Sequence, residues 1–485
     1  MKGLKLGVET MIRVLWIDDD LRYLEAGKDT LRSELWRLGI TAEIETCARS
    51  FEGLGLLDDS PFDLILLDLH FASKDRLRDG FHFLDKLADK GIKTPVVIVS
   101  DYVRGAGRAD ETRRLHFESD LRNFKDQYLR AFSKTDRGRD ELVQFISEFV
   151  SKPPAVIVLL SDLHLGSLSK RGQTLNDFTR DMELEFSEMR IRFKPNYLCV
   201  TGDFALKGKP QGLRDAAFFL RRTQQALNIE GSASLHFCAG NHDIFRGEHN
   251  PWQGFQGLIE ALGESDSAIF RRFSTFRPEL GELGTFQKQR DLLAISQGKD
   301  ASVLFVAFNS VNPDQDNGHT GLIGNEQWSA FKTRMRKHGF PGSQLRIALL
   351  HHHMFPIPVD HSEIEERILM DHATALHQLR AAGIQLVMHG HAHFSCIHWH
   401  RFKVLNSFGN ERQEENNEMV FIGAPTFNGT PDSGTPVRQY AIVTIGFYDP
   451  VSSSRSFEVH TRVYVPTERK WVDGQCVKQA LPSLA

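Results

Sequence analysis

The stretch Leu235-His236-Phe237-Cys238-Ala239-Gly240-Asn241-His242-Asp243 joins an apolar run to a polar tetrapeptide. The apolar run, 235–239, predicts a buried strand, and the four residues after it predict the loop into which the strand turns. Catalytic groups of layered α/β folds collect in such loops. Asn241, His242 and Asp243 are therefore candidates for a functional site at the end of a strand.

Four other apolar runs end in the same way. The polar stretches that follow them are Ser161-Asp162-Leu163-His164, Thr201-Gly202-Asp203, His351-His352-His353 and His389-Gly390-His391-Ala392-His393. If all of these strands lie in one sheet, carboxylates, an amide and several imidazoles converge on one edge of it. The sequence therefore predicts a metal site at that edge.

The types of ligand favour two metal ions rather than one. Asp oxygen, Asn carbonyl oxygen and His nitrogen suit hard or borderline dications, and the absence of cysteine from the set argues against a structural zinc site. One carboxylate can bridge two ions about 3.5–4 Å apart. The two carboxylates, Asp162 and Asp203, do not neutralise two dications, so the site favours an anionic substrate such as a phosphate ester. The metals would also lower the pKa of a bound water and generate hydroxide near neutral pH.

The five motifs, in this order, resemble those of the calcineurin-like metallophosphoesterase family over residues 154–448. The resemblance implies a four-layer α/β/β/α sandwich with a binuclear centre. It implies that one metal is held by Asp162, His164, Asp203 and His393, and the other by Asp203, Asn241, His351 and His391. His352 is the alternative to His351, because three histidines run together where the family has a pair. The resemblance further implies that His242 is a general acid or phosphate contact, oriented by Asp243.

Composition sets broader limits on the protein. A chain of 485 residues can form two or three domains, and its net charge of −4 gives no global basic field for nucleic acid or a membrane surface. The five scattered cysteines are interpreted as reduced, buried residues, and His319 and His353 as solvated loop residues. We find no signal peptide and no apolar run of about 18 residues, so we expect a cytoplasmic protein that does not cross a membrane.

The N-terminal part alternates predicted strands with helical patterns. The strands are expected at 12–17, 40–46, 63–67, 95–99 and 128–132. This rhythm is typical of a doubly wound parallel sheet. Pro153 and Pro154 cannot continue the helix predicted before them, and the next strand begins at once. We therefore expect two domains, at 11–150 and 154–485.

Charged side chains follow three of these N-terminal strands. Asp18, Asp19 and Asp68 form a carboxylate cluster that requires a cation such as Mg²⁺, and Ser100 and Lys134 follow the next two strands. Residues 11–150 resemble the receiver domain of bacterial response regulators, which has a flavodoxin-like fold. The resemblance implies that Asp68 is the phosphoacceptor, Asp18 and Asp19 bind Mg²⁺, Ser100 and Lys134 contact the phosphoryl oxygens, and a histidine kinase is a partner.

Departures from the receiver pattern leave an alternative open for this domain. Ala131 stands where receivers often carry a switch aromatic, and Thr135 replaces the usual proline. The alternative is a receiver-shaped domain that serves only for docking or dimerisation.

Three functions are compatible with the whole sequence. The first is hydrolysis of a small phosphodiester by a binuclear centre of Mn, Fe or Zn, because the motifs resemble the cyclic nucleotide phosphodiesterase-like branch, with receiver phosphorylation tuning the activity. The second is a nuclease, which would need a basic, stacking groove that we do not find in the sequence. The third is a signalling adaptor that uses the phosphoesterase fold as a binding surface, although no expected ligand is missing.

Overall fold

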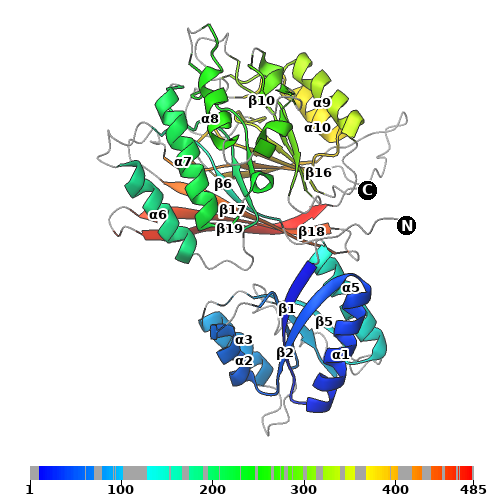
Figure 1. Cartoon of the computed structure of the whole chain (residues 1–485). Helices are drawn as coiled ribbons and strands as arrows, with labels where there is room; N and C mark the ends of the chain where they lie inside the picture. The colour runs from blue at the N-terminus through cyan, green and yellow to red at the C-terminus, as the bar shows by residue number, and fades with distance from the viewer. Residues whose placement is uncertain are drawn as a thin grey trace. The chain divides into compact units, whose positions relative to one another are not determined.

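The computed structural model describes residues 10–59, 62–69, 79–90, 92, 94–101, 128–151, 155–165, 174–188, 195–206, 208–229, 231–245, 249–263, 267–273, 275–277, 282–286, 288–298, 303–312, 320–338, 345–355, 368–393, 395–401, 418–428, 438–449, 454–465, 468 and 470–482. These residues form two compact units, and the second unit begins at Ala155 (Figure 1). None of the helices in the described ranges is both long and apolar enough to cross a membrane.

The first unit is built on one parallel sheet of five strands. In the order β2-β1-β3-β4-β5, the strands are Ile40–Cys47, Thr10–Ile17, Leu64–Leu67, Val96–Val99 and Tyr128–Phe132. All neighbouring pairs run parallel. This is the flavodoxin-like doubly wound order. The fold expected for the N-terminal part is therefore confirmed.

Helices cover both faces of this sheet, which is why its inner strands β3 and β4 are apolar on both sides. The helices are α1 (Leu21–Arg37), α2 (Ser50–Asp59), α3 (Asp79–Asp89) and α5 (Asp136–Ser151). Figure 1 shows α1 and α5 on one side of the sheet and α2 and α3 on the other, and a separate apolar core lies on each side. Asp20 caps α1, because its Oδ1 accepts hydrogen bonds from the backbone amides of Arg22 and Tyr23 at 3.0 and 3.1 Å.

The second unit contains two sheets of six strands. In spatial order, the first consists of β19 (Lys470–Pro482), β18 (Ser454–Val465), β17 (Gln439–Asp449), β6 (Ala155–Leu160), β7 (Tyr197–Val200) and β8 (Leu235–Phe237). The second consists of β11 (Ala294–Gln297), β12 (Val303–Ala307), β13 (Leu345–Leu349), β14 (Leu386–His389), β16 (Glu418–Gly423) and β15 (Cys396–Arg401). The strands that precede the polar motifs are thus divided between two sheets, so the assumption that they lie in a single sheet is wrong.

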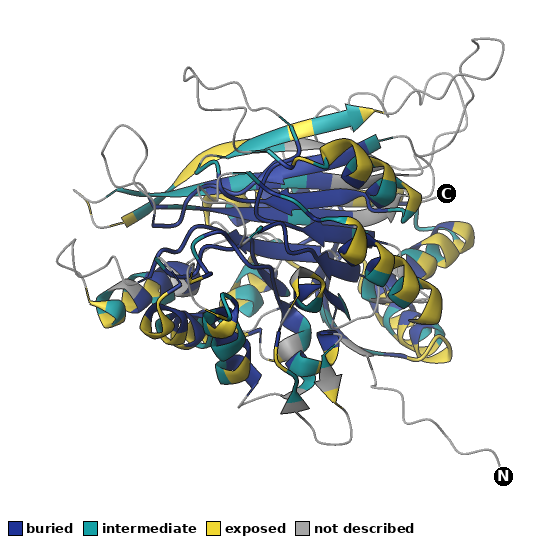
Figure 2. Cartoon of the chain, turned by 90° about the horizontal axis from the view of Figure 1, so that it is seen from above, coloured by how far each residue is buried: buried dark blue, intermediate teal, exposed yellow. Residues whose placement is uncertain are grey.

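Helices form the outer layers of the second unit. Figure 1 shows α6 (Leu175–Glu188), α7 (Pro210–Ala226) and α8 (Gln253–Gly263) on one side, and α9 (Asn325–His338) and α10 (His372–Ala381) on the other. The two sheets face each other, because the rings of Tyr197 in β7 and Phe305 in β12 pack with centroids 5.0 Å apart. Figure 2 shows buried strands between helices whose outer faces are exposed. These layers confirm the expected α/β/β/α sandwich.

A buried charge network fastens α6 to the first of these sheets. Glu185 of α6 accepts hydrogen bonds from Arg462 Nε at 2.7 Å, Arg462 Nη2 at 3.1 Å and the Tyr440 hydroxyl at 2.6 Å. The pKa of Tyr440 is raised well above its ordinary value, mainly by burial and to a smaller extent by the charge of Glu185. The hydroxyl therefore remains a donor. A carboxylate and a guanidinium at this depth need each other as partners.

Candidate metal centre

The backbone at the predicted ligands is unusual. Among the described residues, six that are not glycine have a positive φ, and five of these six are predicted metal ligands: Asp162 (φ 54°), His164 (42°), Asp203 (56°), His391 (69°) and His393 (61°). Left-handed backbone is unfavourable for such residues and persists only where the surroundings enforce it. Its concentration here indicates a site whose side chains are aimed by the fold.

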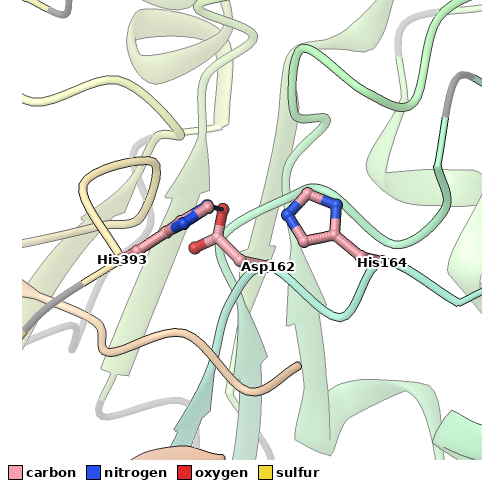
Figure 3. A group of neighbouring side chains, drawn as sticks. All are labelled: Asp162, His164 and His393. Carbon is pink, nitrogen blue, oxygen red and sulfur yellow. Dashed lines mark ion pairs between the residues drawn. The ribbon is translucent and has the colours of Figure 1, made fainter. Parts of the chain in front are cut away.

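One cluster consists of Asp162, His164 and His393 (Figure 3). Figure 3 shows the Asp162 carboxylate between the two imidazole rings, and His393 Nε2 lies 3.3 Å from Asp162 Oδ1. Both oxygens of Asp162 are buried, and neither accepts a well-formed hydrogen bond from the described residues. A buried carboxylate in this condition is costly unless a cation neutralises it. The cluster therefore fits a metal ion.

A second cluster brings together Asn241, His351 and His391. Asn241 Oδ1 lies 2.8 Å from His351 Nε2 and 3.1 Å from His391 Nδ1, and these two nitrogens are 3.1 Å apart. Ligand atoms about 2.1 Å from one ion are roughly 3 Å apart at octahedral angles. Three donor atoms at such spacing in a buried position also fit a metal ion.

A backbone carbonyl orients His351 toward this second cluster. His351 Nδ1 lies 2.7 Å from the Thr201 carbonyl oxygen and donates to it, so Nε2 is the nitrogen that would offer a lone pair to a metal ion once it has lost its proton. Metal-binding histidines are commonly oriented in this way. His352 Nδ1 instead lies 2.9 Å from the hydroxyl of Ser310. Of the two histidines considered from the sequence, the geometry favours His351.

Asp203 lies between the two clusters. Its Oδ2 is 3.4 Å from His351 Nε2, and it shares a group of close ligand atoms with Asp162 and His351. Its Oδ1 accepts a hydrogen bond from the His242 amide at 2.7 Å. The loops approach so closely that a Cβ on Gly202, which has φ 95°, would lie 2.7 Å from Gly240 Cα. This placement suits a carboxylate that is shared between two ions.

Charge coupling within the site is strong. Burial alone would raise the pKa of Asp203, but the charges of His351 and His242 lower it well below the ordinary value. Burial alone would lower the pKa of His351, but the Asp203 charge and hydrogen bond raise it to about 9. In the metal-free protein the proton on His351 thus balances the carboxylates, and a metal ion would replace it.

Asp243 does not orient His242 as expected from the sequence. Its carboxylate accepts hydrogen bonds from the backbone amides of Gly240 at 2.8 Å, Asp203 at 2.9 Å and Ala205 at 3.1 Å. The pKa of Asp243 is raised to about 8, mainly by burial and to a smaller extent by the charge of Asp203. Asp243 therefore joins the loops after β7 and β8, while the half-buried His242 packs its ring 5.0 Å from that of His164.

Two further findings differ from the sequence analysis. His353 is buried rather than solvated, and burial, followed by the neighbouring His389, lowers its pKa to about 2. His319 lies outside the described residues.

The supporting role of Ser310 was missed: its hydroxyl accepts hydrogen bonds from the amides of His351 and His352 at 3.2 and 3.1 Å. Ser310 closely follows an apolar run, so the same rule of polar residues at strand ends could have found it.

The acidic residues of the first unit also come together. Lys134 Nζ lies 2.6 Å from both Asp18 Oδ2 and Asp68 Oδ2, and ligand atoms of Asp18, Asp19 and Asp68 lie within 4.8 Å of one another. Burial is the main cause that raises the pKa of Asp18 to about 6. Burial would lower the pKa of Lys134, but the hydrogen bonds that Lys134 donates to Asp18 and Asp68 raise it. Ser100 is buried at the end of the neighbouring strand β4.

A sandwich of two sheets between helices, with buried aspartates and histidines at its strand ends, fits the class of metal-dependent phosphoesterases. In agreement with this class, residues 155–395 match the family described as Calcineurin-like phosphoesterase. Residues 155–395 therefore form a calcineurin-like phosphoesterase domain, and they follow a unit with a flavodoxin-like doubly wound sheet. The family is one of phosphoric ester hydrolases that typically bind two metals, and the buried aspartates and histidines provide candidate ligands for them.

Solved structures give weak overall similarities. The receiver domain of the Francisella response regulator 1452 is 21% identical, with 28% of this chain and 97% of that chain covered and a TM-score of 0.20. The response regulator TrrA from Thermotoga maritima is also 21% identical, with 28% of this chain and 98% of that chain covered and a TM-score of 0.22. A putative 5'-nucleotidase from Staphylococcus aureus is 12% identical, with 68% of this chain and 55% of that chain covered and a TM-score of 0.33. No curated protein matches this chain.

Proposed function

We propose that this protein is a phosphodiesterase that acts on a small phosphodiester, with phosphorylation of Asp68 regulating its activity. The observation that supports this proposal most strongly is the meeting of two clusters of donor atoms at Asp203. One ion would be held by Asp162, His164, Asp203 and His393, and the other by Asp203, Asn241, His351 and His391. When bound, two divalent cations such as Mn²⁺, Fe²⁺ or Zn²⁺ polarise a phosphoryl oxygen and lower the pKa of water.

The residues of the chain supply the remaining requirements. Asp162 and Asp203 leave two dications only partly neutralised, so an anionic ester is attracted to the site. His242 is half-buried and lies beside His164, where its imidazole can contact a phosphoryl oxygen or donate a proton to the leaving oxygen. The three backbone amides bound to Asp243 keep the loops that carry Asp203 and His242 in register.

The proposal is tested by hydrolysis of a chromogenic phosphodiester and the matching monoester in the presence of Mn²⁺, with bound metal measured in parallel. We expect turnover of both esters, with the diester favoured. A preference for the monoester would contradict the assignment of a diester. Lack of turnover of either ester by metal-loaded protein, with or without phosphorylation of Asp68, would contradict the hydrolase proposal and favour the adaptor. Faster cleavage of single-stranded DNA would favour a nuclease.

Replacing His242 with asparagine is expected to lower kcat by roughly 100-fold, because general acid catalysis and an oxyanion contact are lost together. The number of bound metal ions should not change, since His242 is outside both clusters of donors. His377→Asn, at an exposed position on α10, is the matched control. Unchanged kcat in the His242 variant, or a loss of bound metal, would show that His242 has another role.

Phosphorylation of Asp68 is expected to change kcat/KM at least a few-fold. Acetyl phosphate with Mg²⁺ should transfer its phosphoryl group to the Asp68 carboxylate and release acetate, because Lys134 and a Mg²⁺ ion held by the carboxylates of Asp18 and Asp19 can balance the negative charge of the phosphoryl group. Mass spectrometry should detect the adduct on the native protein and on Asp29→Asn, but not on Asp68→Asn. An adduct without any change in kcat/KM would support a docking role only.

A further inference from the structure

Glu458, His460 and Cys476 form a further cluster of potential metal ligands, separate from the phosphoesterase site and from the acidic site of the first unit. His460 in β18 lies directly opposite Cys476 in β19, and Glu458 precedes His460 by two residues. Residues two apart on a strand, and residues opposite each other in an antiparallel pair, share one face of a sheet. The three side chains therefore project from the same face of one hairpin.

The ligand atoms of this cluster are close together. Cys476 Sγ lies 3.5 Å from His460 Nε2 and 3.7 Å from Glu458 Oε1. Ligand atoms of a tetrahedral zinc ion, at about 2.0–2.3 Å from the metal, are roughly 3.3–3.6 Å apart. His460 Nε2 and Glu458 Oε1 contact each other directly, so an ion placed between the three atoms would replace that contact.

We propose that Glu458, His460 and Cys476 bind one Zn²⁺ ion, with the fourth coordination position left to water. Thiolate, imidazole and carboxylate are the zinc ligands of proteins, and this set differs from the thiol-free binuclear centre. Cys476 is exposed and outside any disulfide, which corrects the expectation that all five cysteines are buried. An ion in this position would connect β18 to β19, which is the edge strand of its sheet, and would oppose fraying of that edge.

Cobalt provides a test that is independent of the phosphoesterase activity. Co²⁺ bound to a thiolate gives a charge-transfer band in the near ultraviolet, and the binuclear centre contains no cysteine. Titration of the full chain with Co²⁺ should produce this band, and Asp203→Ala should retain it. Cys476→Ser should abolish the band, whereas Cys396→Ser, which changes another cysteine outside any disulfide, should not. Absence of the band in the native protein, or its persistence in Cys476→Ser, would overturn the proposal.

Alkylation of Cys476 provides a second test that does not depend on replacing the cysteine. Zn²⁺ should slow the reaction of Cys476 with iodoacetamide by at least about tenfold, because a metal-bound sulfur is a poorer and less accessible nucleophile. The protection should be lost in His460→Asn and weakened in Glu458→Gln. An equal alkylation rate with and without Zn²⁺ in the native protein would contradict zinc binding by Cys476, whatever the activity of the phosphoesterase site.

Discussion

Replacing Asp203 with alanine is expected to lower kcat/KM for phosphate esters by on the order of 10³-fold or more, since metal ions supply several kcal/mol of stabilisation to the transition state. Asp203 is the residue expected to contact both ions. Its Oδ2 faces His351, and it shares a group of ligand atoms with Asp162. Loss of its carboxylate should therefore weaken both metal positions, whereas loss of His393 or Asn241 should weaken one of them first.

A second substitution at this position separates metal binding from folding. Asp203→Asn keeps an oxygen that can accept the hydrogen bond from the His242 amide, but it removes the negative charge. We expect both variants to lose bound metal and activity, and the asparagine variant to unfold at nearly the temperature of the metal-free native protein. Measurements of kcat/KM, metal content and thermal unfolding on the same preparations test this. Activity within tenfold of native in Asp203→Ala would rule out a shared ligand at this position.

The candidate ligands could be predicted from sequence because each motif directly follows an apolar run. The position of Asp162 after β6, or of His391 after β14, depends only on where a strand ends. The flavodoxin-like unit was predictable for a similar reason, since β3 and β4 are short apolar runs and β2 alternates apolar and polar residues. In both units, local sequence determines which side chains stand at the carboxyl ends of strands.

Features that depend on side-chain direction or on distant strand pairing were not predictable in this way. The division of the motifs between two sheets follows from the antiparallel β17 pairing with β6, and these strands are far apart in the sequence. Asp243 is directed toward three backbone amides, and His351 is oriented by the Thr201 carbonyl, through contacts between separate loops. His353 is buried, and its segment forms a bridge with Ile368. None of these contacts has a signal in a single stretch of sequence.

The attachment of α6 to its sheet leads to the second large effect that we expect. Glu185→Ala should lower the free energy of unfolding by about 3 kcal/mol, because breaking a buried ion pair leaves the remaining charge and the Tyr440 hydroxyl without their acceptor. Glu185 is 6% exposed and Tyr440 is fully buried. This loss of unfolding free energy should lie at the lower end of the range found when buried ion pairs are broken, since Arg462 also pairs with Asp473 on its exposed side.

A neighbouring glutamate on the same helix provides a matched control. Glu183 pairs with Arg222, but both side chains are considerably more exposed, at 28% and 46%. Exposed ion pairs contribute little, so Glu183→Ala should cost less than about 1 kcal/mol. Urea unfolding of the two variants compares the same substitution, two residues apart, at buried and exposed pairs. Equal losses would mean that the intrinsic properties of α6, rather than the buried network, determine the stability of this layer, because Glu185 and not Glu183 hydrogen-bonds to β17 and β18.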